Sequence, residues 1–114
     1  SIATKTSIGN GGYITIFFNK KLTLINGITA KLYKDGILVD TVVPTISSNT
    51  ILSCNFSAYF ITLANGSYDV VIEKNKVFGG GQFWEGYKIG EYHFNVVDGY
   101  YNETYYNQNY YLTN

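Results

Sequence analysis

Apolar and polar residues alternate along most of the chain with a period of two, and no segment has the spacing of an amphipathic helix. In residues 13–18, for example, the alternation places Ile14, Ile16 and Phe18 on one face. Successive side chains of a strand point to opposite faces of a sheet, so this pattern predicts strands that are buried on one side. The same pattern predicts strands at 22–24, 28–33, 37–43, 50–56, 59–63, 68–74 and 87–97.

Turn residues separate these segments and indicate the fold class. Asp35-Gly36 lies between two alternating runs and predicts a tight hairpin, because a type I′ turn needs positive φ at both central residues. Pro44 ends the strand that follows, and Asp98-Gly99 predicts another turn. Seven to eight short strands at this spacing are typical of an all-β sandwich, with a β-barrel as the structural alternative.

One local motif makes the fold prediction more specific. In segment 63–70 a Leu is followed by a turn containing Gly66 and then by Tyr68, which opens an alternating strand. This arrangement resembles the tyrosine corner of immunoglobulin-like and fibronectin-type domains, in which a Tyr hydroxyl bonds back to the backbone. The resemblance covers residues 13–97 and implies an immunoglobulin-like/fibronectin-type β-sandwich with Tyr68 buried. It implies nothing about function, because such sandwiches have many activities.

Composition and charge exclude several classes of function. The chain has 114 residues, which is enough for one domain with one core, and only 14% of them are charged. All eight basic residues are Lys and the formal net charge is zero, which argues against nucleic-acid binding. No apolar run approaches the roughly 18 residues that a membrane-spanning helix needs.

The chain offers little for catalysis or metal binding. Cys54 is the single Cys, which excludes an intramolecular disulfide and a Cys-based zinc site, and His93 is the single His, which argues against catalytic triads and His-rich metal sites. Alternation places Cys54 on the buried face of its strand, and it places His93, Asp69 and Glu73 on solvent faces. We therefore predict no catalytic residue, no metal and no cofactor, and a protein that is not an enzyme.

The first eight residues alternate as a strand does, and the side chains on one of their faces are all β-branched. A Gly-rich segment at 9–12 predicts a hinge, because glycine has little conformational preference. A strand that belonged to its own domain would not need such a joint. We therefore predict that the tail 1–12 pairs with a neighbouring subunit as a donor strand, while 13–114 form the β-sandwich head. The donor-strand residues are Ile2, Thr4, Thr6 and Ile8, and the hinge residues are Gly9, Gly11 and Gly12.

Three segments match the Asn-x-Ser/Thr acceptor sequence for N-glycosylation, at Asn55, Asn65 and Asn102. The Asn, Ser and Thr content of the chain would give about two such matches by chance, so the number itself shows no excess. Their positions favour modification more than their number does. Asn55 falls on the outward face of its strand, Asn65 in a turn and Asn102 in a polar tract.

Two aromatic features are candidates for surface contacts. Phe83 and Trp84 lie in the Gly-rich segment 79–86, where they form either a sugar-stacking finger or a cover for an open end of the sandwich, which is the favoured interpretation. The segment 100–114 repeats a Tyr-Tyr pair every five residues. In a strand, that period gives both faces aromatic rings, which suits a strand packed between two surfaces; the alternative is a frayed terminal strand.

Taken over its whole length, the chain resembles the adhesive thread filament subunits of thermoacidophilic archaea in architecture and composition. The features that carry the resemblance are the tail strand, the Gly hinge, the small head, the scattered sequons and the Tyr/Asn-rich, weakly charged surface. The chain contains no Met and begins at Ser1, as either a processed precursor or a trimmed initiator Met would. The resemblance implies secretion, N-glycosylation at the three sequons and head-to-tail joining of identical subunits through residues 1–8.

The resulting functional hypothesis is a non-enzymatic structural subunit of an extracellular, adhesive filament at the cell surface. Its partners would be identical subunits, with glycans or cell surfaces as further partners. The alternatives are a virion decoration protein with an immunoglobulin-like fold and a glycan-binding surface module that uses Trp84. A processed, sugar-bearing mass would favour the filament subunit, and an unmodified mass would favour the virion protein.

Overall fold

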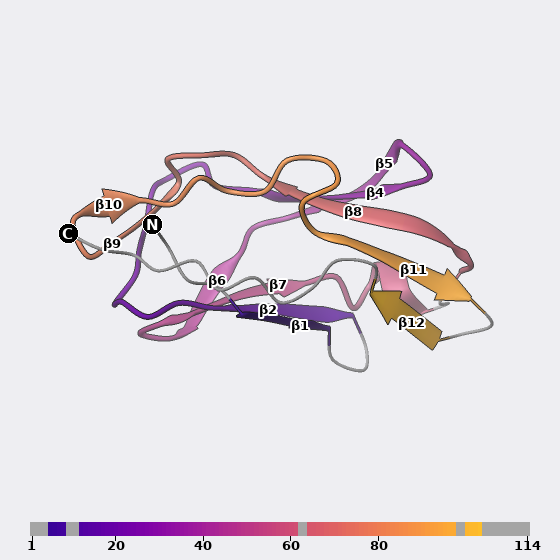
Figure 1. The fold of residues 1–114 in the computed structure, drawn as a ribbon, viewed down its shortest axis with the longest axis horizontal. Helices are drawn as coiled ribbons and strands as arrows, with labels where there is room; N and C mark the ends of the chain where they lie inside the picture. The colour runs from indigo at the N-terminus through magenta and orange to yellow at the C-terminus, as the bar shows by residue number, and fades with distance from the viewer. Residues whose placement is uncertain (1–4, 9–11, 62–63, 98–99, 104–114) are drawn as a thin grey trace.

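The computed structural model describes residues 5–8, 12–61, 64–97 and 100–103. These residues form strands β1 to β12 in three antiparallel sheets, and they contain no α-helix (Figure 1). The one helical segment among them is the short 3-10 turn η1 (Tyr59–Ile61). The all-β fold class that the sequence predicts is therefore confirmed.

Two larger sheets form two layers, and a small sheet lies at one end (Figure 1). The four-stranded sheet has the order β1 (Lys5–Ile8), β2 (Tyr13–Phe17), β7 (Ile51–Asn55), β6 (Thr45–Ser48). The five-stranded sheet has the order β12 (Tyr100–Glu103), β11 (His93–Val97), β8 (Gly66–Ile72), β4 (Ala30–Lys34), β5 (Ile37–Val42). The small sheet has the order β10 (Gln82–Phe83), β9 (Val77–Gly79), β3 (Thr23–Leu24).

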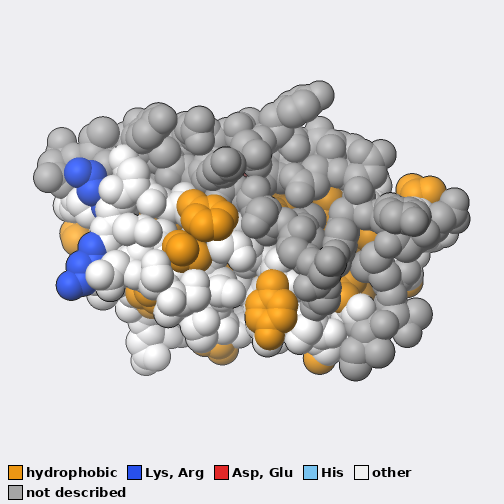
Figure 2. All heavy atoms as spheres, turned by 90° about the horizontal axis from the view of Figure 1, so that it is seen from below, with side chains coloured by type: hydrophobic (Ala, Val, Ile, Leu, Met, Phe, Trp, Pro, Cys, Tyr) orange, Lys and Arg blue, Asp and Glu red, His pale blue; other side chains and the backbone are white. Residues whose placement is uncertain are grey.

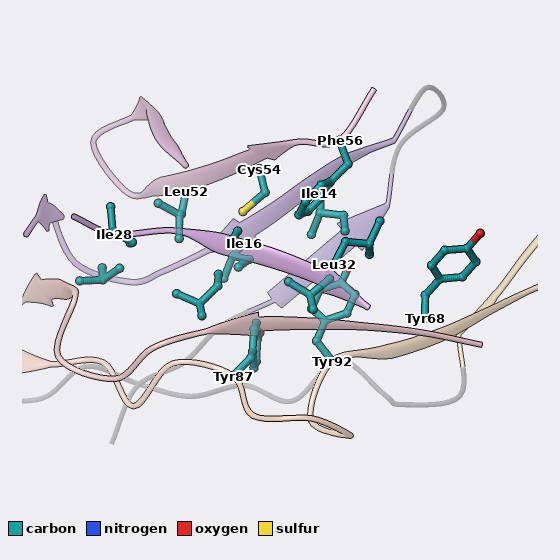
Figure 3. Packing of buried hydrophobic residues seen from close by; sticks show 14 of the residues in the cluster. Ile14, Ile16, Ile28, Leu32, Leu52, Cys54, Phe56, Tyr68, Tyr87 and Tyr92 are labelled. Atoms are coloured by element: carbon teal, nitrogen blue, oxygen red, sulfur yellow. The ribbon is translucent and has the colours of Figure 1, made fainter. Parts of the chain in front are cut away.

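The hydrophobic core lies between the two larger sheets, as the close view in Figure 3 shows. Ile14 and Leu52 of the four-stranded sheet and Leu32 and Phe94 of the five-stranded sheet have no exposed surface. The alternation of the sequence predicts the inward faces correctly, because one face of each strand is covered by the opposite sheet. The buried residues at the inward positions of these alternating segments include Ile14, Ile16, Phe18, Ile28, Ala30, Leu32, Leu52, Cys54, Phe56, Tyr92, Phe94 and Val96.

The hairpin between β4 and β5 confirms the turn predicted at Asp35-Gly36. Asp35 has φ of 50° and Gly36 has φ of 83°, and Lys34 pairs with Ile37 across the turn. Both central residues thus have the positive φ that a type I′ turn requires. A β-bulge between Leu32 and Tyr33 then shifts the register along the hairpin.

Two predicted strands are wrong in whole or in part. The sequence predicts a strand at 59–63, but Tyr59–Ile61 form a turn because the N–H groups of Tyr59 and Phe60 both bond to the Phe56 carbonyl. Residues 62–63 lie outside the described residues. The expected strand 87–97 is regular only over His93–Val97. Tyr87, in the irregular part, pairs with Ile72 of β8 through an isolated antiparallel bridge.

The Gly-rich segment is more ordered than its composition suggests. The sequence predicts a loop there, whereas β9 and β10 form a hairpin in which Gly79 pairs with Gln82. Gly80 and Gly81 connect the two strands with φ of 60° and 79°. Glycine adopts these angles without steric cost, so the two residues allow a tight turn rather than a loose loop.

Candidate assembly edges and modification sites

The described part of the tail strand pairs within its own chain. β1 is an edge strand of the four-stranded sheet, and its register places Lys5 opposite Phe17 and Ile8 opposite Ile14 of β2. The expectation that this strand leaves its own head is therefore not met in the single chain. The physical reason is that the outer edge of β2 offers a full ladder of hydrogen-bond partners within reach of the tail.

The individual tail residues divide between described and undescribed positions. Thr6 and Ile8 lie opposite Ile16 and Ile14 of β2, so both candidate donor positions are paired in the same chain. Ile2, Thr4, Gly9 and Gly11 lie outside the described residues.

Gly12 is held by packing, which differs from the free joint that the sequence suggests. Its φ is +82°, and its carbonyl accepts a hydrogen bond of 3.0 Å from the N–H of Phe56. A Cβ at this position would lie 2.6 Å from Cδ2 of Phe60. Any movement of the tail must therefore take place on the N-terminal side of Gly12.

The outer face of the four-stranded sheet is weakly charged. Figure 2 views this side of the molecule, and its described part shows separate hydrophobic side chains, with Lys at one end and no Asp or Glu. Tyr13 and Phe17, which point outward from β2, are 46% and 37% exposed. Such a face has few charges to oppose contact with another uncharged surface.

Apolar side chains are also exposed on β5 and in the connection from β5 to β6. β5 is the edge of the five-stranded sheet and β6 is the edge of the four-stranded sheet. Ile37 is 68% exposed and Val43, between the two strands, is 70% exposed. An edge strand that exposes apolar side chains together with unpaired backbone groups favours association with another strand.

The three sequons differ in how the structure presents them. Asn55 is exposed at the end of β7, and its Oδ1 accepts a hydrogen bond of 2.9 Å from the N–H of Ser57. This Asx turn fixes the side chain and directs the amide nitrogen, which is the atom that a glycan would join, away from the bond. Asn65 precedes β8 and is exposed, and Asn102 lies on β12 opposite Asn95.

Tyr68 has the geometry that the sequence predicts for it. Its ring is fully buried and stacks on Phe94 at a centroid distance of 5.1 Å. Its hydroxyl donates a hydrogen bond of 2.8 Å to the carbonyl of Ala64, four residues earlier. Figure 3 shows the hydroxyl at the margin of the core, where it reaches the backbone without burying an unpaired group.

Trp84 and Phe83 occupy different environments. Trp84 is only 2% exposed and packs edge-to-face on Phe18 and Tyr87, with centroid distances of 5.2 and 4.9 Å. Phe83 is 45% exposed and contacts Phe78. The favoured interpretation of Trp84 as a covering residue agrees with this burial, and Trp84 offers no surface for stacking on a sugar.

A polar cluster on the outer face of the five-stranded sheet joins β8 to β11. Ser67 Oγ lies 3.0 Å from His93 Nε2, and His93 Nδ1 lies 3.0 Å from Asp69 Oδ1. Asp69 Oδ1 also accepts a 3.0 Å hydrogen bond from the N–H of Gly90. Asp35 Oδ1 accepts a hydrogen bond of 3.0 Å from the N–H of Ser67. The hydrogen bond from Ser67 is the largest cause of a lowered pKa for Asp35, and a hydrogen bond from the Lys34 side chain lowers it further.

This cluster corrects two sequence-based expectations and shows their limit. His93 and Asp69 were placed in solvent, but their side chains are only 24% and 13% exposed. The sequence does show that Ser67 and Asp69 share one face of a strand, because they are two residues apart. It does not show that His93 lies opposite Asp69, since that depends on the register of two strands distant in sequence.

The remaining candidate groups give simple results. Burial raises the pKa of the Cys54 thiol to about 12, as expected for a buried Cys that acts as a hydrophobic residue. Over the described part of the chain, no three His, Cys, Asp or Glu side chains come close enough to bind a metal ion. A helix with the length and hydropathy to cross a membrane is likewise absent from the described ranges.

Comparison of the chain with protein-family models, with curated proteins and with solved structures finds no match to any of them.

Proposed function

We propose that this chain is a non-enzymatic structural subunit of an extracellular filament in which neighbouring subunits exchange the tail strand β1. The proposal includes an immunoglobulin-like β-sandwich as the fold of the head. The observation that carries it is the place of β1 in the sheet order: it lies at an edge and, among the described strands, pairs with β2 alone. The other three strands of this sheet, β2, β7 and β6, pair with one another without β1.

An edge strand at one end of the chain can be supplied by a second copy at little cost. The pairs between β1 and β2 are the same whether β1 comes from its own chain or from the next one. Exchange of β1 between two subunits therefore loses few contacts. Its equilibrium depends mainly on the local concentration of subunits and on the segment that joins β1 to Gly12. The single chain represents the closed form, and the filament would be the open form of the same pairing.

Two further observations support an assembled state. The edge strand β5 exposes Ile37 and Leu38, and Val43 is exposed between β5 and β6; a second subunit would cover these side chains. The low content of charged residues, 14%, reduces electrostatic repulsion between copies. Glycans at Asn55 and Asn65 would keep other parts of the surface from pairing.

A disulfide engineered between β1 and β2 shows whether β1 comes from the same chain or from a neighbouring subunit. The variant with Ser7→Cys and Thr15→Cys places the new thiols at directly opposed positions of β1 and β2. Native Cys54 is fully buried and does not compete. After assembly at high concentration and mild oxidation, a denaturing gel without reductant should show a ladder of disulfide-linked multimers.

The matched control places cysteines across the β4–β5 hairpin, which cannot be exchanged in this way. Lys31→Cys with Thr41→Cys, also an opposed pair, should give disulfide-linked monomers only. If the Ser7–Thr15 variant also gives monomers only, in samples that electron microscopy shows to contain filaments, strand exchange is wrong. If the protein forms no filaments and stays monomeric, the filament function itself is wrong, and a virion decoration protein becomes the favoured function.

A further inference from the structure

The polar cluster on β8 and β11 has the order of groups that activates a serine nucleophile. An ionised carboxylate can only accept a hydrogen bond, so the proton of the neutral His93 ring lies on Nδ1, facing Asp69. His93 Nε2 is then the acceptor for the Ser67 hydroxyl at 3.0 Å. A hydroxyl bonded to an imidazole that a carboxylate orients is the arrangement of nucleophile, base and positioning residue.

The group opposite Ser67 is a side-chain amide. The register pairs Ser67 with Asn95, and both side chains are half-buried on the outer face of the sheet. The N–H of Val70 bonds to the carbonyl of Tyr92 at 3.0 Å, which marks that pair as hydrogen-bonded. Hydrogen-bonded and non-hydrogen-bonded pairs alternate, so Ser67 and Asn95 form one of the close, non-hydrogen-bonded pairs.

The spacing of such a pair fits a covalent bridge. An ester between Ser67 and Asn95 would join the two Cβ atoms through an oxygen and a carbonyl carbon, the same number of bonds as in a disulfide. Disulfides hold Cβ atoms about 3.8 Å apart and join Cα atoms about 4.4–6.8 Å apart. A close antiparallel pair has a Cα separation of about 4.5 Å, which falls inside that range.

We propose that Ser67 and Asn95 form an intramolecular ester that locks β8 to β11. Ser67 Oγ attacks Cγ of Asn95 while His93 Nε2 takes the hydroxyl proton. The tetrahedral adduct then collapses, the bond from Cγ to the amide nitrogen breaks, and the proton on His93 passes to that nitrogen. One ammonia leaves and one ester forms, so atoms and charge balance without any oxidant or metal.

The surroundings of Ser67 favour one internal event over turnover of a free substrate. The N–H of Ser67 is bonded to the carboxylate of Asp35, so it cannot stabilise an oxyanion next to its own side chain. A slow single reaction can do without that help, because fixed neighbours on two strands react with effective concentrations of about 10⁵ M or more. Released ammonia is protonated and diluted in neutral water, which makes the step irreversible.

Peptide mapping of the folded full-length protein tests the bridge. Cleavage after Lys yields fragment 35–74, which contains Ser67, and fragment 89–114, which contains Asn95. The ester predicts that these two fragments appear as one linked species, lighter than their sum by one ammonia. Ring closure at the Asn65-Gly66 bond also releases ammonia, but it leaves the two fragments separate.

Variants assign the roles of the residues. Ser67→Ala and Asn95→Ala should each abolish the linked species, whereas Ser53→Ala, a half-buried Ser on β7, should keep it. His93→Gln should slow linkage about 100-fold, the effect of removing a general base. Asp69→Asn should slow it while Asp69→Glu restores part of the rate, at unchanged circular dichroism.

The wild-type digest decides the proposal even if a variant fails to fold. Separate fragments after prolonged incubation of the folded wild-type protein would overturn the ester, and so would a linked species that persists in Ser67→Ala. Either result leaves the proposed filament function untouched, because the bridge lies within one subunit.

Discussion

Two buried side chains that carry ionisable groups are accommodated in different ways. Tyr68 keeps its ring in the core and sends its hydroxyl to the carbonyl of Ala64. Cys54 lies on the inward face of β7 with no exposed surface, and the burial itself raises the pKa of its thiol to about 12. Burial of Tyr68 is stabilised by a hydrogen bond of its hydroxyl, whereas burial of Cys54 requires that its thiol stay uncharged. Each of these conditions can be tested separately.

For Cys54 the test is the pH dependence of stability. The thiol ionises near pH 9.0 in the unfolded chain and only near a pKa of about 12 in the folded protein. Between these values the folded state binds more protons, so the free energy of unfolding should fall by about 1.4 kcal/mol per pH unit. The contribution is fully present below pH 9.0 and is lost as the pH rises toward about 12.

Denaturant titrations of wild type and Cys54→Ala over this interval isolate the effect, because the two proteins differ only at this thiol. The free energy of unfolding of the wild type, relative to that of Cys54→Ala, should fall as the pH rises. A difference that stays constant with pH would show that Cys54 does not remain protonated in the fold.

For Tyr68 the test is loss of one hydrogen bond. Tyr68→Phe keeps the ring and removes the donor to Ala64 O, which should lower the free energy of unfolding by about 1 kcal/mol. Tyr13→Phe, at a Tyr that is 46% exposed, is the control and should change stability by less than about 0.5 kcal/mol. Equal effects in the two variants would contradict a specific role for the Tyr68 hydroxyl.

At the scale of elements, the sequence predicts strands that are covered on one side and fails where a loop or a turn replaces them. Alternation identifies the inward residues of β2, β4, β7 and β11 because these strands lie between core and solvent. It mistakes 59–63 for a strand, since apolar content there reflects packing of Phe60 on Tyr68. It misses β6, whose four residues are all exposed and therefore show no inward face.

A loop replaces the first half of the expected strand 87–97. Two glycines in and before this loop differ in how much room the structure leaves for a side chain. Gly86 and Gly90 both have positive φ, +72° and +88°. A Cβ on Gly86 would collide with the carbonyl oxygen of Ile72, whereas a Cβ on Gly90 would meet nothing within 4 Å. The two positions thus share backbone strain and differ in steric contact.

Alanine substitution at these two glycines separates the two effects. Gly90→Ala should cost about 1 kcal/mol, from the left-handed backbone conformation alone. Gly86→Ala should cost about 1–3 kcal/mol more, because the backbone of β8 or the loop must move to admit the methyl group. Thermal or denaturant unfolding measures both, and equal losses would mean that the loop does not approach Ile72 as closely as described.

At the scale of the whole molecule, the sequence predicts that β1 is a strand but not where it pairs. Its alternation fits any sheet edge with an uncovered ladder, and within one chain the edge of β2 is the nearest. The cluster of Ser67, Asp69 and His93 shows the same limit, since it exists only through the register of β8 and β11. Pairing between distant segments is what periodicity within one segment cannot encode.

Removal of the tail tests whether the site beside β2 accepts a strand from outside the chain. Deletion of residues 1–8 should lower the free energy of unfolding by about 3 kcal/mol, since a few ladder hydrogen bonds worth about 1 kcal/mol each are lost. The shortened protein should not form filaments. A synthetic peptide of residues 1–9 should restore the stability in a concentration-dependent way, because a strand that binds only the folded state shifts the folding equilibrium.

A peptide in which Thr6 and Ile8 are replaced by Asp is the matched control for this rescue. It keeps the length and the backbone donors but opposes charged side chains to Ile16 and Ile14, so it should restore little stability. Equal rescue by both peptides would show that binding is not specific to this register. If the unaltered peptide gives no rescue at concentrations that saturate a weak complex, then β1 acts only within its own chain, and strand exchange cannot be how subunits of this protein are joined.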